Sequence, residues 1–262
     1  MEELPVKICL LASGSGGNSI CVQNGSSSVL IDAGLTGKKI EERLRGVGFD
    51  PAGLQAVVVS HEHSDHIKGV GVLARRYGLP IWMTEGTLNA SKKIFRGTEK
   101  IRVFENDEAF SIGDLSFQAF QLPHDAADPV NFSVTDGQAN VTIATDMGTV
   151  TQLVYQYMRR ADLLIIESNY DRQLLMDGPY PWVLKQRINS THGHLSNDGA
   201  AEALCDLARE GLQQAVLAHL SEKNNRPDLA RETCADMLQG QGIRSFPMSV
   251  AEQDRPSDIF VI

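Results

Sequence analysis

Three histidines and two acidic residues occur within six positions of the chain, in the order His61-Glu62-His63-Ser64-Asp65-His66. Imidazole and carboxylate groups at this density are typical of a divalent metal site, because burying them without a metal would be costly in free energy. The spacing differs from the helical His-Glu-x-x-His signature of zinc proteases. Glu62 lies between the candidate ligands, and we expect it to point away from them without a catalytic role.

The spacing within this cluster predicts two neighbouring groups of ligands. The β-branched run at 57–59 predicts a buried strand that would hold the cluster in place. In an extended backbone, His61 and His63 would face the same side. Asp65 and His66 would follow where the chain turns into a helix, for which we expect Ser64 to be the cap. This layout suits two adjacent metal ions.

Other polar side chains follow further apolar strands of the predicted sheets. They are His124, Asp146, Glu167 and His219, which come after the strands expected at 115–122, 140–144, 161–166 and 215–218. One such group could be incidental, but together with the cluster they mark five strand exits. We therefore predict that all five meet in a single site.

A loop rich in glycine and serine, 13–19, follows the first predicted strand. It lacks the Gly-Lys-Ser/Thr of a P-loop, and the strand expected after it excludes a dinucleotide fingerprint. Its backbone N–H groups could face an anion, or the loop could simply form a tight hairpin, and we weigh these alternatives equally. Ser15 and Asn18 are the candidate substrate-binding residues. Asp32, at another strand exit, could either orient a ligand histidine or form a hydrogen bond within its turn.

The periodicity along the chain predicts alternating strands and helices in two similar halves. We expect a helix capped by Thr36, one continuous helix at 67–77, a helix at 89–95 and a strand at 243–246. With no linker, low-complexity segment or short-period repeat, the whole chain, 1–262, is expected to form a single domain.

Composition narrows the class of protein. The chain has 262 residues, no apolar run long enough to span a membrane, and four scattered cysteines without a Cys-x-x-Cys pair. A reduced, cytoplasmic protein is expected. The net charge of −9 argues against a protein that coats nucleic acid, although two divalent ions would add about four positive charges locally. The oligomeric state is left open.

The His-x-His-x-Asp-His pattern resembles the metallo-β-lactamase superfamily of hydrolases. The resemblance implies an α/β (α+β) fold, a four-layer αββα sandwich with the site at one edge of two facing sheets. It also implies a role for each ligand. One metal ion would be held by His61, His63 and His124, and a second by Asp65, His66 and His219. The carboxylate of Asp146 and a hydroxide would be shared between the two ions. Ligands of nitrogen and oxygen alone suit zinc, manganese or iron.

Four motifs in order narrow the resemblance. They are Leu-Ala-Ser-Gly-Ser-x-Gly-Asn-Ser, His-Glu-His-Ser-Asp-His-Ile-Lys-Gly, Gly-His-Leu-Ser-Asn and His-Leu-Ser-x-x-Asn-Asn, and together they resemble the YycJ/WalJ group. That resemblance implies 5′-to-3′ exonuclease activity on double-stranded DNA, with a DNA end as the substrate. The chain has no room for the arm or clamping domain of other nuclease relatives, which suits action at an end.

Glu167 and His194 match positions where phosphodiesterase branches of the superfamily carry a glutamate and a histidine. A histidine held by a carboxylate could protonate a departing alkoxide, so His194 and Glu167 are candidate catalytic residues. Asp65, one of the candidate metal ligands, is the third. The alternative for His194 is an ordinary residue of a helix-capping loop. A terminal 5′-phosphate would lie in the Gly/Ser loop, with the next phosphates expected at Arg172, Lys185, Lys223 and Arg226.

A second kind of enzyme remains open, a hydrolase of a small phosphodiester, a lactone or a thioester. The negative charge and the missing clamp favour it, whereas Glu167 with His194 and the motif series oppose it. A degenerate protein without activity is disfavoured because no ligand position is substituted.

Overall fold

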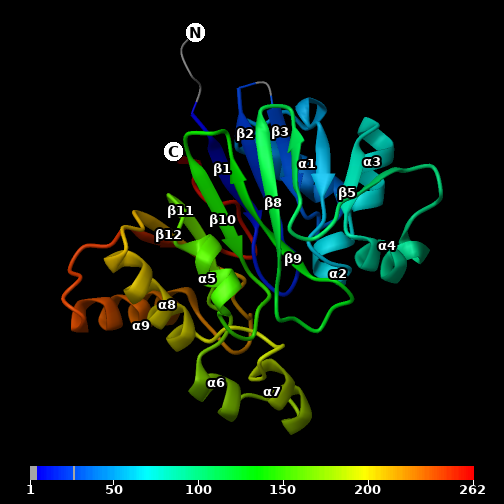
Figure 1. The fold of residues 1–262 in the computed structure, drawn as a ribbon. Helices are drawn as coiled ribbons and strands as arrows, with labels where there is room; N and C mark the ends of the chain where they lie inside the picture. Colours follow the sequence, from blue (N-terminus) through cyan, green and yellow to red (C-terminus); the bar gives the residue numbers. More distant parts are fainter. Residues whose placement is uncertain (1–4, 26) are drawn as a thin grey trace.

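Two seven-stranded sheets face each other (Figure 1); the first combines the N-terminal strands with the last strand of the chain, and the second is built from the strands between them. The structure is a computed structural model that describes residues 5–25 and 27–262. In strand order, the first sheet consists of β14 (Phe260–Val261), β1 (Lys7–Ala12), β2 (Ser19–Asn24), β3 (Ser27–Ile31), β4 (Ala56–Val58), β5 (Pro80–Met83) and β6 (Lys100–Val103). The second consists of β13 (Met248–Val250), β12 (Gln214–Ala218), β11 (Leu163–Glu167), β10 (Asn140–Ala144), β9 (Val130–Thr135), β8 (Leu115–Gln121) and β7 (Ala109–Ile112).

Alternation along the strands creates three apolar layers. In β1, Ile8 and Leu10 face the space between the sheets, whereas Cys9 and Leu11 face the helices outside. β11 does the same in the second sheet, with Ile165 inward and its neighbours packed on the outer helices. These strands are buried on both faces, which explains why they are almost continuously apolar.

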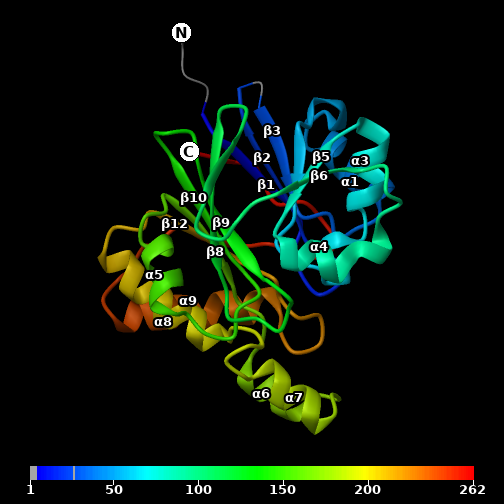
Figure 2. The same ribbon diagram turned by 45° about the vertical axis from the view of Figure 1, so that its right-hand side comes forward.

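The outer layers are helical. The first sheet is covered by α1 (Gly37–Gly46), α2 (Ser64–Ile67), α3 (Val70–Tyr77) and α4 (Glu85–Ser91), and the second by α5 (Gln152–Met158), α8 (Asn197–Arg209) and α9 (Pro227–Gly240) (Figures 1 and 2). Short 3₁₀ turns cover Pro51–Gly53 and Lys92–Ile94. The predicted four-layer αββα sandwich is confirmed. In the described part of the chain, no helix combines the length and the apolar character needed to cross a bilayer.

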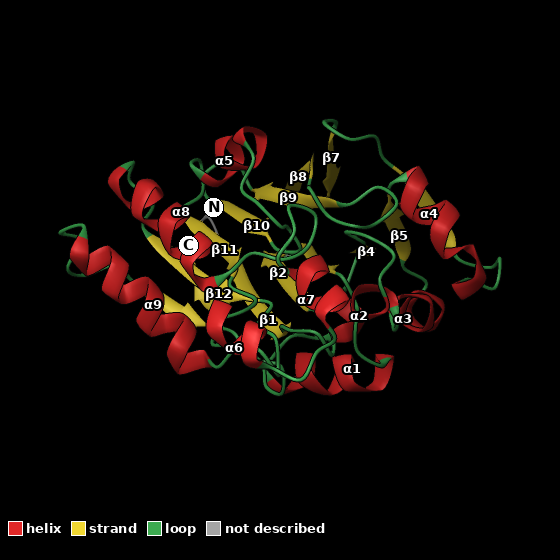
Figure 3. Cartoon of the chain, turned by 90° about the horizontal axis from the view of Figure 1, so that it is seen from below, coloured by secondary structure: helices red, strands yellow, loops and turns green. Residues whose placement is uncertain are grey.

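Two further helices, α6 (Arg172–Asp177) and α7 (Trp182–Ile188), extend below the sandwich (Figure 2). In the view from below, α7 lies in front of the strand ends (Figure 3), and its residues line one pocket together with Asp65 of α2. These helices follow β11, so they lie beside the exits of the second sheet.

Several predicted boundaries are wrong. The helix expected at 67–77 begins earlier and is divided into α2 and α3, because Gly69 turns between them and donates its N–H to the carbonyl of Ala33. The cap of α2 is His63, without a side-chain hydrogen bond, and Ser64 is the first helical residue. The helix predicted at 89–95 is α4, which ends at Ser91.

The strand expected at 243–246 is also absent, because the last strand of the second sheet is β13. By contrast, Thr36 caps α1 as predicted, with its hydroxyl accepting the N–H of Lys39.

Candidate metal centre

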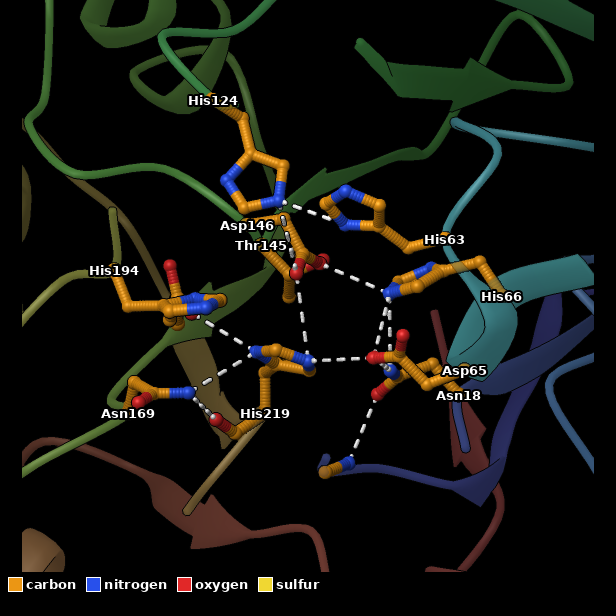
Figure 4. A network of polar contacts seen from close by, with 12 residues as sticks. Asn18, His63, Asp65, His66, His124, Thr145, Asp146, Asn169, His194 and His219 are labelled. Atoms are coloured by element: carbon orange, nitrogen blue, oxygen red, sulfur yellow. Dashed lines mark hydrogen bonds and ion pairs between the residues drawn. The ribbon is translucent and has the colours of Figure 1, made fainter. Parts of the chain in front are cut away.

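Seven candidate ligands from both sheets meet at one edge of the sandwich (Figure 4). His61 and His63 follow β4, and α2 carries Asp65 and His66. The second sheet contributes a residue after each of three strands: His124 after β8, Asp146 after β10 and His219 after β12. The strand exits thus converge as expected, since strands of one sheet that run in the same direction end at the same edge.

The ring nitrogens of His61, His63 and His124 point toward one another. The Nε2 atom of His61 lies 3.1 Å from Nδ1 of His63, which in turn lies 3.3 Å from Nε2 of His124. Only one nitrogen of each such pair can carry a proton between them, so the arrangement is better suited to sharing one cation than to two hydrogen bonds. These three residues can hold a metal ion together.

A second group joins Asp65, His66 and His219. The carboxylate Oδ2 of Asp65 lies 3.4 Å from Nε2 of His66 and 3.6 Å from Nε2 of His219. Asp146 lies between the two groups: its Oδ2 is 3.4 Å from His66, and its Oδ1 is 3.4 Å from His219 and 4.0 Å from His124. The carboxylate of Asp146 can therefore reach both groups.

Two buried atoms in this cluster support a fit to divalent metal. Oδ2 of Asp146 and Nε2 of His219 are buried and have no hydrogen-bond partner among the described residues. Leaving a buried polar atom unsatisfied is unfavourable, and coordination would remove that penalty. The donor set of imidazole nitrogen and carboxylate oxygen is also one that divalent ions accept.

Burial and charge within the cluster shift the pKa of several ligands. Burial lowers the pKa of His66, but the carboxylates of Asp146 and Asp32 outweigh it and raise the pKa well above the ordinary value. For His219, burial is likewise outweighed, by Asp146, Asp65 and Glu167, and its pKa rises to about 10. These two imidazoles are therefore cationic at neutral pH until a metal displaces their protons.

The other ligands shift in the opposite sense. Burial lowers the pKa of His61 and of His124, so neither ring needs to lose a proton before it binds a cation. The carboxyl groups of Asp65 and Asp146 are buried, which disfavours their charge, but the neighbouring imidazolium groups of His66 and His219 lower both pKa values. Both carboxylates are therefore charged and available to a metal.

Asp32 and Ser60 hold the histidine rings of the first sheet. Oδ2 of Asp32 accepts a hydrogen bond from Nδ1 of His66 at 2.8 Å, which directs Nε2 of that ring into the centre. The hydroxyl of Ser60 donates to Asp32 at 2.7 Å and lies 3.0 Å from Nδ1 of His61. Asp32 therefore orients a ligand histidine, which is one of the two roles that the sequence left open for it. The sequence reasoning missed Ser60.

Glu167 holds histidine rings of the second sheet, as Asp32 does in the first. Its Oε1 accepts from Nδ1 of His194 at 2.7 Å and from Nδ1 of His219 at 2.9 Å. Its Oε2 accepts the backbone N–H groups of Met147 and Leu195. This carboxylate is fully buried and already has four donors, so it positions rings rather than binding a metal itself. It fixes His194 with Nε2 left for the pocket.

Asn169 is a further residue that sequence reasoning missed. Its side-chain amide donates to the backbone carbonyl of His219 at 2.7 Å and lies 3.2 Å from Nδ1 of the ring (Figure 4). It follows β11 two residues after Glu167, and that position at a strand exit was a usable signal. The carbonyl of Gly193 contacts Nδ1 of His124 in the same way, at 3.2 Å.

The backbone at three strand exits has left-handed geometry. Asp32, Asp146 and His219 have φ values of 58°, 59° and 56°. This conformation is unfavourable for residues other than glycine and typically persists where the surrounding structure requires it. Here it turns each side chain into the centre directly after its strand.

The Gly/Ser loop lies at the edge of the centre. Asn18 is buried, and its amide nitrogen lies 3.3 Å from Oδ2 of Asp65 and 3.1 Å from Nε2 of His66. The N–H of Gly14 is bonded to Oδ1 of Asn18 and that of Gly16 to Oε1 of Gln253, with other N–H groups of the loop bonded to carbonyls. The tight-turn alternative is therefore favoured over an anion-binding nest, and the exposed Ser15 lines the pocket.

The predicted phosphate-gripping residues do not gather at the pocket. Lys185 is buried and donates to the carbonyl of Met176, Arg172 pairs with Asp198, and Arg226 lies beside Asp228. None of the four residues Arg172, Lys185, Lys223 and Arg226 lines the pocket, which among its described lining residues contains one arginine or lysine, Arg187. As expected, Glu62 points away, because its carboxylate accepts the N–H of Ala127.

Comparison with known proteins supports this geometry. The family model described as "Beta-lactamase superfamily domain" matches residues 27–220. Exodeoxyribonuclease WalJ of Streptococcus pneumoniae serotype 2 (strain D39 / NCTC 7466) is 38% identical over 242 residues, which cover 91% of this chain and 90% of that protein. Exodeoxyribonuclease YycJ of Bacillus anthracis is 36% identical over 235 residues, 89% of each chain. The metallo-β-lactamase fold protein YhfI from Bacillus subtilis has a similar fold, with a TM-score of 0.77 and 22% identity over 98% of this chain and 100% of that one.

Proposed function

The chain belongs to the β-lactamase superfamily, and from this premise we propose that it is a metal-dependent exodeoxyribonuclease that degrades double-stranded DNA from the 5′ end. Two relatives that are named exodeoxyribonucleases align with about nine tenths of the chain. The observation that carries the proposal is the His194–Glu167 pair, because it places a possible proton donor beside the candidate metal ligands. We further propose that residues 1–262 act as one catalytic domain in the cytoplasm, where the four free cysteines would stay reduced.

Two divalent ions are proposed as cofactors, one per ligand group. His61, His63 and His124 would hold the first, while Asp65, His66 and His219 would hold the second, with Asp146 shared. Zinc, manganese and iron all suit these ligands. Once bound, such ions would lower the pKa of a coordinated water and stabilise negative charge on phosphoryl oxygens.

The protein's own groups would complete the hydrolysis. A water molecule would give up one proton to solvent as its oxygen forms a bond to phosphorus, and the bond from phosphorus to the 3′-oxygen of the departing nucleotide would break. His194, protonated on both nitrogens, would donate the proton on Nε2 to that oxygen while its Nδ1–H stays on Glu167. Because a carboxylate can only accept, Glu167 fixes the ring with Nε2 toward the leaving group. On this assignment His194 is a catalytic residue and Glu167 a positioning residue.

The remaining candidates act on binding. Asp65 would hold the second metal while accepting the amide N–H of Asn18, which keeps its carboxylate aimed at the centre. Ser15, on the rim of the pocket, is the proposed substrate contact on this side of the centre, whereas the buried Asn18 is proposed to act on the substrate through Asp65 and His66, which its amide contacts.

A panel of substrates tests the proposal. The metal-loaded protein is incubated with 3′-end-labelled linear duplex DNA, a closed circular duplex, bis-p-nitrophenyl phosphate, a lactone and a thioester. We expect linear DNA to be shortened, closed circles to survive, and the phosphodiester to turn over at least about 100 times faster than the acyl substrates. Preferred turnover of the lactone or thioester would instead support the small-molecule hydrolase.

A further inference from the structure

The pocket beside the ligands, about 230 Å³ in volume, has two walls of different chemistry. The candidate metal ligands form one wall. The other is formed by α7 and the segment just before it: Tyr180, Leu184 and Ile188 supply apolar surface, and Arg187 adds a positive charge. Ligand sites commonly combine apolar walls with a few placed polar groups, but this cavity is smaller than the roughly 300 Å³ at which drug-sized sites begin. It therefore suits one small unit of a polymer rather than a duplex.

The apolar wall is a distinct face of α7. Leu184, Arg187 and Ile188 are spaced three and four residues apart, so they lie on the same side of the helix. Lys185 lies on another side and is buried, with its ammonium group bonded to the carbonyl of Met176 at the end of α6. Val183 is 76% exposed and does not line the pocket. Since α6 fixes the back of α7, its front is held toward the centre.

This wall lies on the same side as His194. The segment after α7 leads directly to Gly193, which contacts His124, and then to His194. Arg187 also pairs with Asp125, the neighbour of His124, and its side chain remains 60% exposed. The proposed proton donor and the apolar wall therefore face the same part of the pocket, where the leaving group must be.

We propose that this wall, which we name the α7 slot (Tyr180, Leu184, Arg187 and Ile188), binds the departing 5′-terminal nucleotide. The inference rests on the proposed exonuclease function and identifies its recognition unit. The three uncharged side chains contact the base and sugar, and Arg187 exchanges Asp125 for the nucleotide's terminal 5′-phosphate. The wall reads no base edges, so cleavage releases one mononucleotide at a time with little sequence preference. The 5′-phosphate is thereby assigned to the α7 slot rather than to the Gly/Ser loop, where the N–H groups of Ser13, Gly14, Gly16, Gly17 and Asn18 are already bonded.

Equilibrium binding tests the slot without relying on turnover. The metal-loaded protein is titrated with thymidine 5′-monophosphate, 2-deoxyribose 5-phosphate, hexyl phosphate and methyl phosphate. Base contact should make the nucleotide bind about 5- to 150-fold more tightly than the sugar phosphate, as stacking on protein side chains typically does. Leu184→Ala and Tyr180→Ala should remove most of this ratio, while the matched exposed substitution Val183→Ala on the same helix leaves it unchanged. Equal binding of nucleotide and sugar phosphate, or equally tight binding of hexyl phosphate, would overturn the slot.

Arg187 has its own test on DNA. Duplexes with a 5′-phosphate or a 5′-hydroxyl are compared for wild type, Arg187→Gln and Ser15→Ala. We expect wild type and Ser15→Ala to prefer the phosphorylated end and Arg187→Gln to lose that preference. If Ser15→Ala alone lost the preference for the phosphorylated end, the 5′-phosphate would bind at the Gly/Ser loop instead. If DNA is degraded but the nucleotide binds no more tightly than the sugar phosphate, the slot is wrong and the exonuclease function stands. If the nucleotide binds more tightly but DNA is not degraded, the slot stands and the exonuclease function is wrong.

Discussion

Asp146 is the carboxylate that lies near histidines of both ligand groups. Its Oδ2 lies near His66, and its Oδ1 lies near His219 of the same group and near His124 of the other. A single side chain therefore couples the two proposed ions.

Asp146→Ala should lose metal as well as activity, because it removes a ligand from both ions at once. We expect fewer than two ions per chain by elemental analysis after dialysis, and at least a 100-fold fall in phosphodiester turnover. Asp125→Ala, a neighbouring carboxylate outside the ligand groups, serves as the control for metal content. Full occupancy by two ions in Asp146→Ala would show that it does not bridge.

His194→Ala should separate chemistry from metal binding. A general acid typically contributes about 10²–10⁴ in rate, so cleavage of DNA, with its poor alkoxide leaving group, should fall by that factor. Cleavage of a p-nitrophenyl ester should fall far less, since its leaving group needs no proton. Both metals should remain, as determined by elemental analysis. Equal losses on the two substrates would exclude the acid role.

Metal binding at pH 7 should release about two protons per chain, because the raised pKa values of His66 and His219 keep both rings protonated in the metal-free protein. Calorimetry in buffers of different ionisation enthalpy measures the number. Raised pKa values stabilise the metal-free fold below about pH 6.5, and the contribution of His219 disappears as the pH rises through about 10. The proton release should therefore shrink toward pH 10, and its absence at pH 7 would contradict these shifts.

At the scale of elements, three segments far apart in the chain are joined by backbone hydrogen bonds beneath the ligands. Asn18 donates its N–H to the carbonyl of Asp65 at 2.7 Å, Gly34 donates to Asn18 at 2.8 Å, and Ala33 donates to His66 at 2.7 Å. The position of α2, and of the two ligands that it carries, therefore depends on how closely the β1–β2 and β3–α1 loops approach.

Gly34→Ala should disturb this junction. A Cβ there would lie 1.6 Å from the carbonyl oxygen of Asp65 and 2.6 Å from the nitrogen of Asn18, so the backbone must move. We expect a loss of about 1–3 kcal/mol in the free energy of unfolding and at least a tenfold loss in affinity for the second metal. Gly46→Ala is the control, because nothing lies within 4 Å of its Cβ and alanine favours helix. Chemical denaturation measures the free energy of unfolding, and metal titration measures the affinity for the second metal. Equal values for Gly34→Ala and Gly46→Ala would show that the close approach at Gly34 does not support the centre.

At the scale of the whole molecule, the acidic balance limits how the protein can hold DNA. The net charge is −9, and Arg187 is the one arginine or lysine among the described residues that line the pocket. Affinity for a polyanion therefore has to come from the centre and the first nucleotide rather than from an extended basic face.

The apparent affinity for a DNA end should consequently depend weakly on salt. Each neutralised phosphate adds about −0.9 to the slope of log K against log [salt], so one or two contacts predict a slope of about −1 to −2. The slope is obtained by measuring KM for the 5′-phosphorylated duplex between 50 and 200 mM NaCl and plotting log (1/KM) against log [salt]. A slope of −5 or steeper would reveal a phosphate-binding surface beyond the pocket.

The sequence by itself determined the αββα sandwich and the set of residues that meet at its edge. Period-two burial in strands such as β1 and β11 is a local property, and a polar residue directly after an apolar strand must lie at the strand's end. The gathering of His124, Asp146 and His219 followed from those signals, whereas the αββα fold class came from the resemblance of the His-x-His-x-Asp-His pattern to the metallo-β-lactamase superfamily. Their roles as metal ligands stay predictions.

Only the tertiary structure decided how the site is supported and what lies opposite it. Ser60 and Asn169 orient ligands across strands, and such contacts between distant segments leave no periodic signal in the chain. The left-handed turn at His219 is likewise imposed by its surroundings. Leu184 and Ile188 have the spacing of an ordinary core-facing helix, and a pattern of apolar residues is the same whether a helix packs against a core or against a cavity. The packing of α7 on α6 resolves that ambiguity, because it directs this face to the pocket beside the ligands.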